Sequence, residues 1–467
     1  MFQFTKKFIG FSIGPIIGAI ISFITVPVTS NLISPDQFGM SSMFNLANTI
    51  ITLIVLIGID QAYMREYNEC TDKRKLLFNC MIIPFTNTVV VAIIMILFRE
   101  FFSQLLFDDK NFTFPVILLA MCTPLFIIEK FFLLSIRMEE KALKYSLWNI
   151  LSKLFNLITL VLLLLFYKRN FESVIYATIL SQLITSVILC FVCRKNIKLS
   201  TKLIDKIQLK KIFKFGLPLV PATLIGYGLN SMDTIFLRIM STYEEIGYYS
   251  VALRITNVLG LLQTSFTSFW SPVAFKWKKN DVDNSKYELV SRGVALGMSV
   301  ILIGILLVKN IIPYILSEEY EKAIYIFPFL LFYPIFYTMS ETTTLGISFS
   351  RKTGYNIVVS IVSLIVNLIL NTILIPIYGA VGAAIATGMS YLVFFWTRTI
   401  ISRKLWYKMP IKHFVITTIT LLAITIANVA ITSLLIISLL NLLAMLIILY
   451  NYRDIVEYIF SMIKGRN

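Results

Sequence analysis

Two apolar stretches of the sequence each carry a cation flanked by amide or hydroxyl side chains at helical spacing. In each stretch the polar residues recur at intervals that place them on one face of a helix. A cation at such a position can bind an anionic group, and its polar neighbours can hydrogen-bond an uncharged one. The members are Asn149, Lys153 and Asn156 in residues 143–167, and Arg254, Asn257 and Thr264 in residues 246–270.

Two further apolar stretches carry polar faces with no cation. Such faces can line a cavity, but small polar residues also join membrane helices to one another, and for the Asn and Ser ridge helix packing is the favoured interpretation. The residues are Tyr333, Tyr337, Glu341, Thr344 and Ser348 on one face, and Asn356, Ser360, Ser363, Asn367 and Asn371 on the other.

Three carboxylates are candidates for coupling to a proton or a cation. Glu341 lies inside an apolar stretch, whereas Asp60 and Asp233 lie near the ends of theirs. Because Asp60 is near Arg65 and Asp233 is near Arg238, a structural or topogenic role is the favoured interpretation for these two.

Other kinds of chemistry find little support in the sequence. It contains no GxxxxGK[ST] nucleotide-binding motif and only one histidine, His413, so nucleotide hydrolysis, nucleophile triads and metal clusters are not expected. The five cysteines form neither a disulfide framework nor a zinc motif. The acidic pair Asp108 and Asp109 resembles that of glycosyltransferases but stands alone in a short loop. We therefore expect no enzyme, no cofactor and no metal site.

The composition is that of an integral membrane protein. Of the 467 residues 57% are hydrophobic and 14% charged, and the mean hydropathy is +0.81. The net charge of +17 could suggest nucleic acid, but the Lys and Arg residues lie in clusters between apolar runs. Topogenic charge explains this distribution better, and no nucleic-acid partner is expected.

Runs of about 20 apolar residues predict about fourteen transmembrane helices. Most of the 42 Lys and Arg residues fall in alternate loops, and this asymmetry predicts that both termini are cytoplasmic. The opposite loops hold only Arg99, Lys110, Lys168, Arg169, Arg238, Lys309 and Lys322. The predicted spans are 8–32, 43–62, 76–98, 113–135, 143–167, 172–193, 212–238, 246–270, 288–310, 323–346, 355–375, 379–401, 411–432 and 434–452.

Residues 34–50 align without gaps with residues 242–258 at an offset of 208. Six predicted spans separate the two copies, so both halves have the same topology, as in parallel-repeat transporters. We expect two pseudo-symmetric six-helix bundles around a central cavity, followed by an extra helix pair. The predicted divisions are a bundle over 1–193, a basic cytoplasmic linker over 194–211, a second bundle over 212–404, and a helix pair with a cytoplasmic tail over 405–467.

A cation inside a membrane helix costs about 2.5–3.5 kcal/mol on insertion scales. Lys153 and Arg254 therefore either face a substrate or form an internal ion pair, and the substrate interpretation is favoured.

Four segments resemble the polysaccharide-biosynthesis flippases of the multidrug/oligosaccharidyl-lipid/polysaccharide exporter superfamily, a group that includes the O-antigen and capsule repeat-unit exporters. The segments are "DQFGMSSMFNLA" (36–47), "GLPLVPATLIGYGLNSMDTIFL" (216–237), "EEIGYYSVALRI" (244–255) and "YGAVGAAIATGMSY" (378–391).

This resemblance implies a flippase in the bacterial cytoplasmic (inner) membrane that moves an undecaprenyl-diphosphate-linked oligosaccharide to the outer leaflet by alternating access. It also implies contact with membrane lipids and with the polymerase and glycosyltransferases of the same glycan. The alternatives are a lipid II flippase and a multidrug or cation antiporter of the same superfamily. The substrate cavity is expected to use Lys153, Arg254, Asn149, Asn156, Asn257, Tyr337, Glu341 and Asn367.

Overall fold

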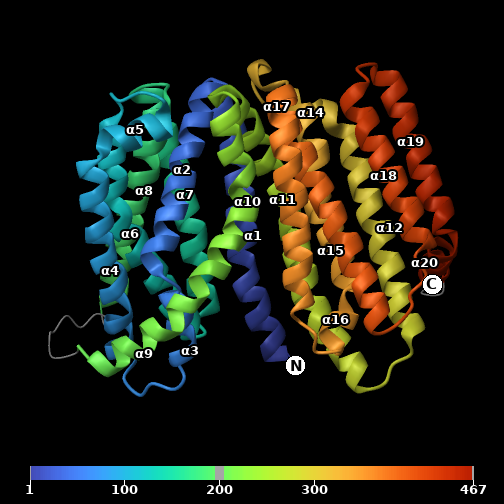
Figure 1. The fold of residues 1–467 in the computed structure, drawn as a ribbon, viewed down its shortest axis with the longest axis horizontal. Coiled ribbons are helices and arrows are strands. Elements are labelled where there is room, and N and C mark those ends of the chain that lie inside the picture. Colours follow the sequence, from blue (N-terminus) through green and yellow to red (C-terminus); the bar gives the residue numbers. More distant parts are fainter. Residues whose placement is uncertain (1, 195–203, 465–467) are drawn as a thin grey trace. The chain divides into compact units, whose positions relative to one another are not determined.

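The computed structural model describes residues 2–194 and 204–464, and these residues form helices with no β-strand (Figure 1). The chain divides into two compact units, Met1–Met232 and Asp233–Asn467. The expected all-α membrane fold is confirmed. The predicted bundle and linker boundaries stay predictions, and residues 195–203 of the predicted linker lie outside the described part of the chain.

Unit 1 is built around close helix pairs. Helix α1 packs along α7, where a Cβ on Gly14 would lie 2.4 Å from the Ser146 Cα, so only glycine permits this approach. The Gly14 N–H donates to Ser146 Oγ at 3.1 Å. The helices are α1 (Phe2–Ser30), α2 (Pro35–Leu56), α3 (Ile59–Glu66), α4 (Lys73–Leu97), α5 (Arg99–Phe107), α6 (Thr113–Met138), α7 (Ala142–Phe166), α8 (Phe171–Val192) and α9 (Lys206–Gly216).

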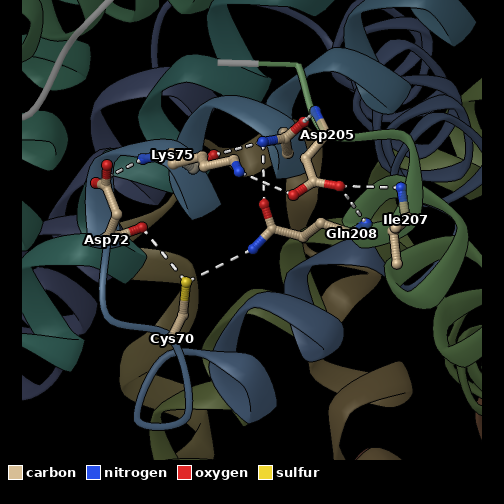
Figure 2. Close-up of polar contacts among 7 residues, drawn as sticks. Cys70, Asp72, Lys75, Asp205, Ile207 and Gln208 are labelled. Carbon is tan, nitrogen blue, oxygen red and sulfur yellow. Dashed lines mark hydrogen bonds and ion pairs between the residues drawn. The ribbon is translucent and has the colours of Figure 1, made fainter.

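Helix α9 occupies part of the predicted linker and packs against α3 and α4. Figure 2 shows the polar contacts of its first turn. The Asp205 carboxylate accepts the N–H groups of Ile207 and Gln208 and pairs with Lys75 at 2.8 Å, and Gln208 accepts a hydrogen bond from Asn79 at 3.0 Å. Hydrogen bonding from Lys75 lowers the pKa of the Asp205 carboxyl. This pair therefore supports the docking of α9 at neutral pH and is lost as pH falls through that lowered pKa.

Unit 2 begins at Asp233, inside α10 (Val220–Met240). Its other main helices are α11 (Tyr243–Lys279), α12 (Asn284–Val308), α13 (Ile312–Ile315), α14 (Ala323–Leu330), α15 (Phe332–Thr343), α16 (Leu345–Phe349), α17 (Tyr355–Leu405), α18 (Lys412–Ala430), α19 (Leu434–Asn451) and α20 (Arg453–Lys464).

Helix α17 is two helices joined at a kink. Its 51 residues would span about 77 Å as one straight α-helix, more than twice the thickness of the hydrocarbon core. The break lies at Gly379, whose φ of 54° and ψ of −128° are outside the helical region and suit glycine. This division agrees with the predicted separate spans 355–375 and 379–401.

In the described residues, eleven helices are long and apolar enough to cross a membrane, with α17 counted once. The chain is therefore a multi-pass membrane protein. Helices α10 and α11 are not among the eleven. The total of fourteen spans stays a prediction.

The internal repeat reappears as a repeated contact within each unit. In unit 1, Gln37 Oε1 accepts the N–H of Phe171, the first residue of α8, at 2.8 Å. In unit 2, Glu245 Oε2 accepts the N–H of Ala380, which begins the second half of α17, at 2.7 Å. Gln37 and Glu245 occupy aligned positions of the two copies. The same side-chain position therefore caps the start of the sixth predicted span and of the twelfth.

The final helix pair belongs to the packed core of unit 2. Helices α18 and α19 both pack against α12, and their buried amides Asn428 and Asn441 hydrogen-bond at 2.9 Å. Buried Lys309 donates to the Asn428 carbonyl, and Arg292 pairs with Asp454 at 2.6 Å. The charge distribution predicts Lys309 in an outer loop. In the structure Lys309 is instead buried and contributes to the packing of the final helix pair.

Candidate functional site

The polar face of α7 in unit 1 carries an exposed cation. Lys153 is exposed, and its side chain runs beside Gly18 of α1, where a Cβ would lie 3.5 Å from Lys153 Cγ. Asn149 donates to the Tyr145 carbonyl at 2.9 Å, and Asn156 donates to Ser181 of α8 at 3.3 Å. The two amides therefore also serve the internal structure of unit 1.

A carboxylate lies within electrostatic reach of Lys153. Glu129 on α6, for which the sequence indicates no role, accepts a hydrogen bond from Gln182 of α8 and interacts with the Lys153 charge. An exposed cation near a partly buried carboxylate is compatible with either sequence-based interpretation of Lys153, substrate contact or ion pair. Both stay predictions.

In unit 2, Arg254 is half-buried on α11, and the nearby phenol of buried Tyr320 interacts with its charge. Asn257, one turn further along α11, is exposed. The cation and the amide therefore lie on the same helix, as expected.

A strip of aromatic side chains lies between α15 and α17. Tyr337 stacks on Phe394 with ring centroids 5.5 Å apart, and the Arg398 guanidinium lies over both rings at 5.6 and 4.8 Å. Arg398 also pairs with Glu341 at 2.8 Å and donates to Ser340 at 2.8 Å. Glu341 is thus held by a resident arginine, a partner that the sequence analysis did not identify.

The strip continues toward α11. The ring centroids of Tyr333 and Tyr391 lie 4.7 Å apart, and the Tyr333 hydroxyl donates to Gln263 Oε1 at 3.3 Å. Tyr333, Tyr337, Tyr391 and Phe394 are only half-buried. Such a surface offers aromatic faces and hydroxyls to a polar ligand.

A buried carboxylate cluster forms around Asp233 on α10. The side chain is 2% exposed and accepts hydrogen bonds from Tyr249 at 2.5 Å, Asn371 at 2.7 Å, Asn367 at 3.2 Å and the Thr387 hydroxyl. All four donors are uncharged. Two hydroxyl and two amide N–H groups thus converge on this buried carboxylate and satisfy its oxygens.

Three of the segments that carried the family resemblance meet at this cluster. Asp233 belongs to "GLPLVPATLIGYGLNSMDTIFL", Tyr249 to "EEIGYYSVALRI" and Thr387 to "YGAVGAAIATGMSY". The last two segments also meet where Glu245 caps Ala380. Asn367 and Asn371 of the polar ridge complete the cluster. The three family-like segments are therefore joined by direct side-chain contacts in unit 2.

In the described part of the chain, Asp60 and Asp233 make contacts with residues other than the neighbouring arginines. Asp60 lies 3.8 Å from Lys130, and Arg65 lies over the Phe215 ring at 4.5 Å. Arg238 lies over the Tyr243 ring at 4.9 Å. Asp60 is thus partnered by a cation of α6, whereas the hydrogen-bond donors around Asp233 are neutral.

The long apolar helices of this fold define a multi-pass membrane protein. The family model described as "Polysaccharide biosynthesis protein" matches residues 4–278, more than half of the chain. The protein therefore belongs to the polysaccharide biosynthesis protein family. No curated protein matches the sequence significantly.

Solved structures with a similar fold include several membrane transporters. The lipid II flippase MurJ in an inward closed conformation is 18% identical, with a TM-score of 0.70 over 96% of this chain and 99% of that one. An inward-facing multidrug resistance MATE family transporter of the MOP superfamily is 14% identical, with a TM-score of 0.63 over 83% and 94%. A MOP superfamily transporter from Pyrococcus furiosus is 14% identical, with a TM-score of 0.52 over 85% and 95%.

Two features of the site were not found from the sequence. Arg398 lies inside the predicted span 379–401, but the charge distribution assigns it to the following loop, so its pairing with Glu341 is not predicted. The donors Tyr249 and Thr387 are too far from Asp233 in the chain to be paired by spacing. Both residues belong to segments that carry the family resemblance, and this is the sequence signal that could have found them.

Proposed function

We propose that this protein is a flippase that moves an undecaprenyl-diphosphate-linked oligosaccharide from the cytoplasmic to the outer leaflet of the bacterial cytoplasmic membrane. The observation that carries the proposal is membership of the polysaccharide biosynthesis family in a chain whose fold resembles that of a lipid II flippase. Flipping requires no covalent chemistry. Both termini are cytoplasmic in this proposal, and the lipid-linked glycan is the substrate.

Lys153 and Arg254 are proposed to receive the diphosphate. The headgroup is anionic, and charge-assisted hydrogen bonds from a cation are stronger than neutral ones. Each cation lies on a helix that also carries amides, and the half-buried aromatic strip of unit 2 can contact sugar rings and hydroxyls. A single cavity shared by Lys153 and Arg254 stays a prediction.

Ion coupling is proposed at Asp233 in preference to Glu341 or Asp60. Glu341 is neutralised by Arg398, and Asp60 lies near Lys130. Among the described residues, the hydrogen-bond donors to the Asp233 carboxylate are neutral. A cation or proton that reaches Asp233 would therefore change the charge of the cluster. The membrane potential can contribute as well, because outward movement of an anion releases roughly 2.3 kcal/mol per charge per 100 mV.

The test of the substrate contacts is export of the surface glycan in cells that depend on this protein. We expect Lys153→Ala and Arg254→Ala each to reduce export at least about tenfold, the loss expected from one charge-assisted hydrogen bond. Lys153→Arg and Arg254→Lys should retain most of the export. Lys144→Ala, which removes a cation from the start of α7, is the matched control. Unchanged export in both alanine variants and in the double variant, at normal protein levels, would refute the assignment.

Lipid II is the second candidate substrate, and the similarity of the fold to MurJ over nearly the whole chain favours it. Expression of this protein in cells depleted of their own lipid II flippase separates the two candidates. Restored growth would support lipid II. No rescue, together with loss of the surface glycan when the protein is absent from its own host, would support the oligosaccharide. The multidrug antiporter is disfavoured because the cations Lys153 and Arg254 suit an anionic substrate.

A further inference from the structure

A cavity lies at one end of unit 2, beside the cap that Glu245 forms on Ala380. Its volume is about 440 Å³, within the range of small-molecule sites. It opens where α11 begins, where α17 breaks and where α18 ends. Its lining includes Glu245, Lys322, Tyr325, Tyr378, Val381 and Thr432. None of the proposed substrate or coupling residues lines it.

The polar end of the cavity presents an acceptor and a donor side by side. Glu245 is fixed, because its Oε2 caps the Ala380 N–H at 2.7 Å. Its other oxygen, Oε1, lies 3.8 Å from Lys322 Nζ, too far for a direct hydrogen bond. A hydroxyl group can donate to the carboxylate and accept from the ammonium at the same time. The pair is therefore spaced for a ligand that carries hydroxyl groups.

The rest of the lining suits the ring of such a ligand. Tyr378 is 56% exposed, and with Tyr325 it supplies aromatic surface, while Val381 adds apolar contact and Thr432 a further hydroxyl. The opposite charges of Glu245 and Lys322 disfavour ligands with a strong net charge of either sign. A neutral ring with apolar faces and hydroxyl edges fits all of these features.

We propose that this cavity binds a neutral saccharide ring. Its source is either the glycan that the protein exports or a glycan free in solution, and the chemistry of recognition is the same for both. Only this question of source rests on the proposed function. In the predicted topology the cavity faces the outer side, since Lys322 lies in a predicted outer loop. A saccharide that has crossed the membrane would meet it there.

The binding test uses saturation-transfer difference NMR on the full-length protein in detergent micelles. The probes are methyl glucoside, methyl galactoside and methyl N-acetylglucosaminide. We expect saturation transfer to at least one probe, with a several-fold loss in Tyr378→Ala and in Lys322→Met. Both side chains are largely exposed, so both variants should fold. Tyr314→Ala removes a 90% exposed tyrosine outside the cavity and should change nothing.

Three results would overturn the proposal. They are no transfer to any probe, equal transfer in the cavity variants and the unchanged protein, and transfer to glycerol phosphate, added as an anionic fourth probe, in place of the sugars. The assay measures binding and involves no transport, so its failure is distinguishable from failure of the proposed function. Failure of the proposed function would appear as unchanged export in the Lys153 and Arg254 variants. Glycan export in Lys322→Met cells then identifies the source: reduced export points to the exported glycan, and normal export to a free saccharide.

Discussion

At the scale of single residues, the buried charges of this protein fall into two groups. Some are paired with an opposite charge, as Glu341 is with Arg398 at 2.8 Å. Asp233 differs, because its four donors are hydroxyl and amide groups. A paired charge mainly stabilises the fold, and its removal leaves the partner uncompensated. A carboxylate with neutral donors can bind and release a proton or a cation without breaking an ion pair. Ion coupling requires this property.

This difference leads to a prediction for three carboxylates. Asp233→Asn should remove the dependence of transport on a proton or sodium gradient, because the neutral amide can neither bind a proton nor attract a cation. Glu341→Gln and Asp60→Asn should keep the gradient dependence, although Glu341→Gln will lower stability by leaving Arg398 unpaired. The measurement is uptake of the lipid-linked substrate into vesicles with an imposed gradient of each ion. Unchanged coupling in Asp233→Asn would move the assignment to another carboxylate.

At the scale of elements, the break in α17 is the feature that most depends on one residue. Gly379 has a φ of 54°, and a Cβ there would lie 2.5 Å from Glu245 Oε2. A side chain would therefore strain the backbone and also disturb the cap on Ala380.

We expect Gly379→Ala to destabilise unit 2 by about 1–3 kcal/mol, the usual cost of a strained backbone position. The measurement is the midpoint of thermal unfolding in detergent. Gly293→Ala in α12 is the matched control, because an added Cβ there meets nothing within 4 Å and alanine favours the helix. Equal midpoints for the two variants would mean that the break tolerates a side chain.

The sequence predicted the helices better than their contacts. Periodicity and hydropathy fixed the membrane class and separated residues 355–375 from 379–401 because these signals are local. The cap of Ala380 by Glu245 and three of the four hydrogen bonds to Asp233 join segments more than 100 residues apart, and no spacing rule connects those. The pairing of Arg398 with Glu341 joins two separate predicted spans, 379–401 and 323–346, and the charge distribution assigns Arg398 to a loop. The repeat at offset 208 was the exception, since it anticipated that Gln37 and Glu245 have equivalent positions.

At the scale of the whole molecule, the number of membrane crossings decides on which side of the membrane each loop lies. The eleven qualifying helices count α17 once and leave out α10 and α11. The loop charges instead predict fourteen spans with both termini cytoplasmic. A single missing or additional span would reverse the side of every loop that follows it, so the sides of a few loops test the count.

The test uses single-cysteine variants of a protein whose five native cysteines are replaced by serine, labelled in intact cells with a maleimide that cannot cross the membrane. Lys110→Cys and Lys168→Cys should be labelled at once, because both lie in predicted outer loops. Lys141→Cys and Lys404→Cys should be labelled only after permeabilisation. All four lysines are exposed, so accessibility to solvent does not distinguish them. Labelling of Lys404→Cys in intact cells would mean an odd number of spans between residues 141 and 404 and would refute the fourteen-span topology.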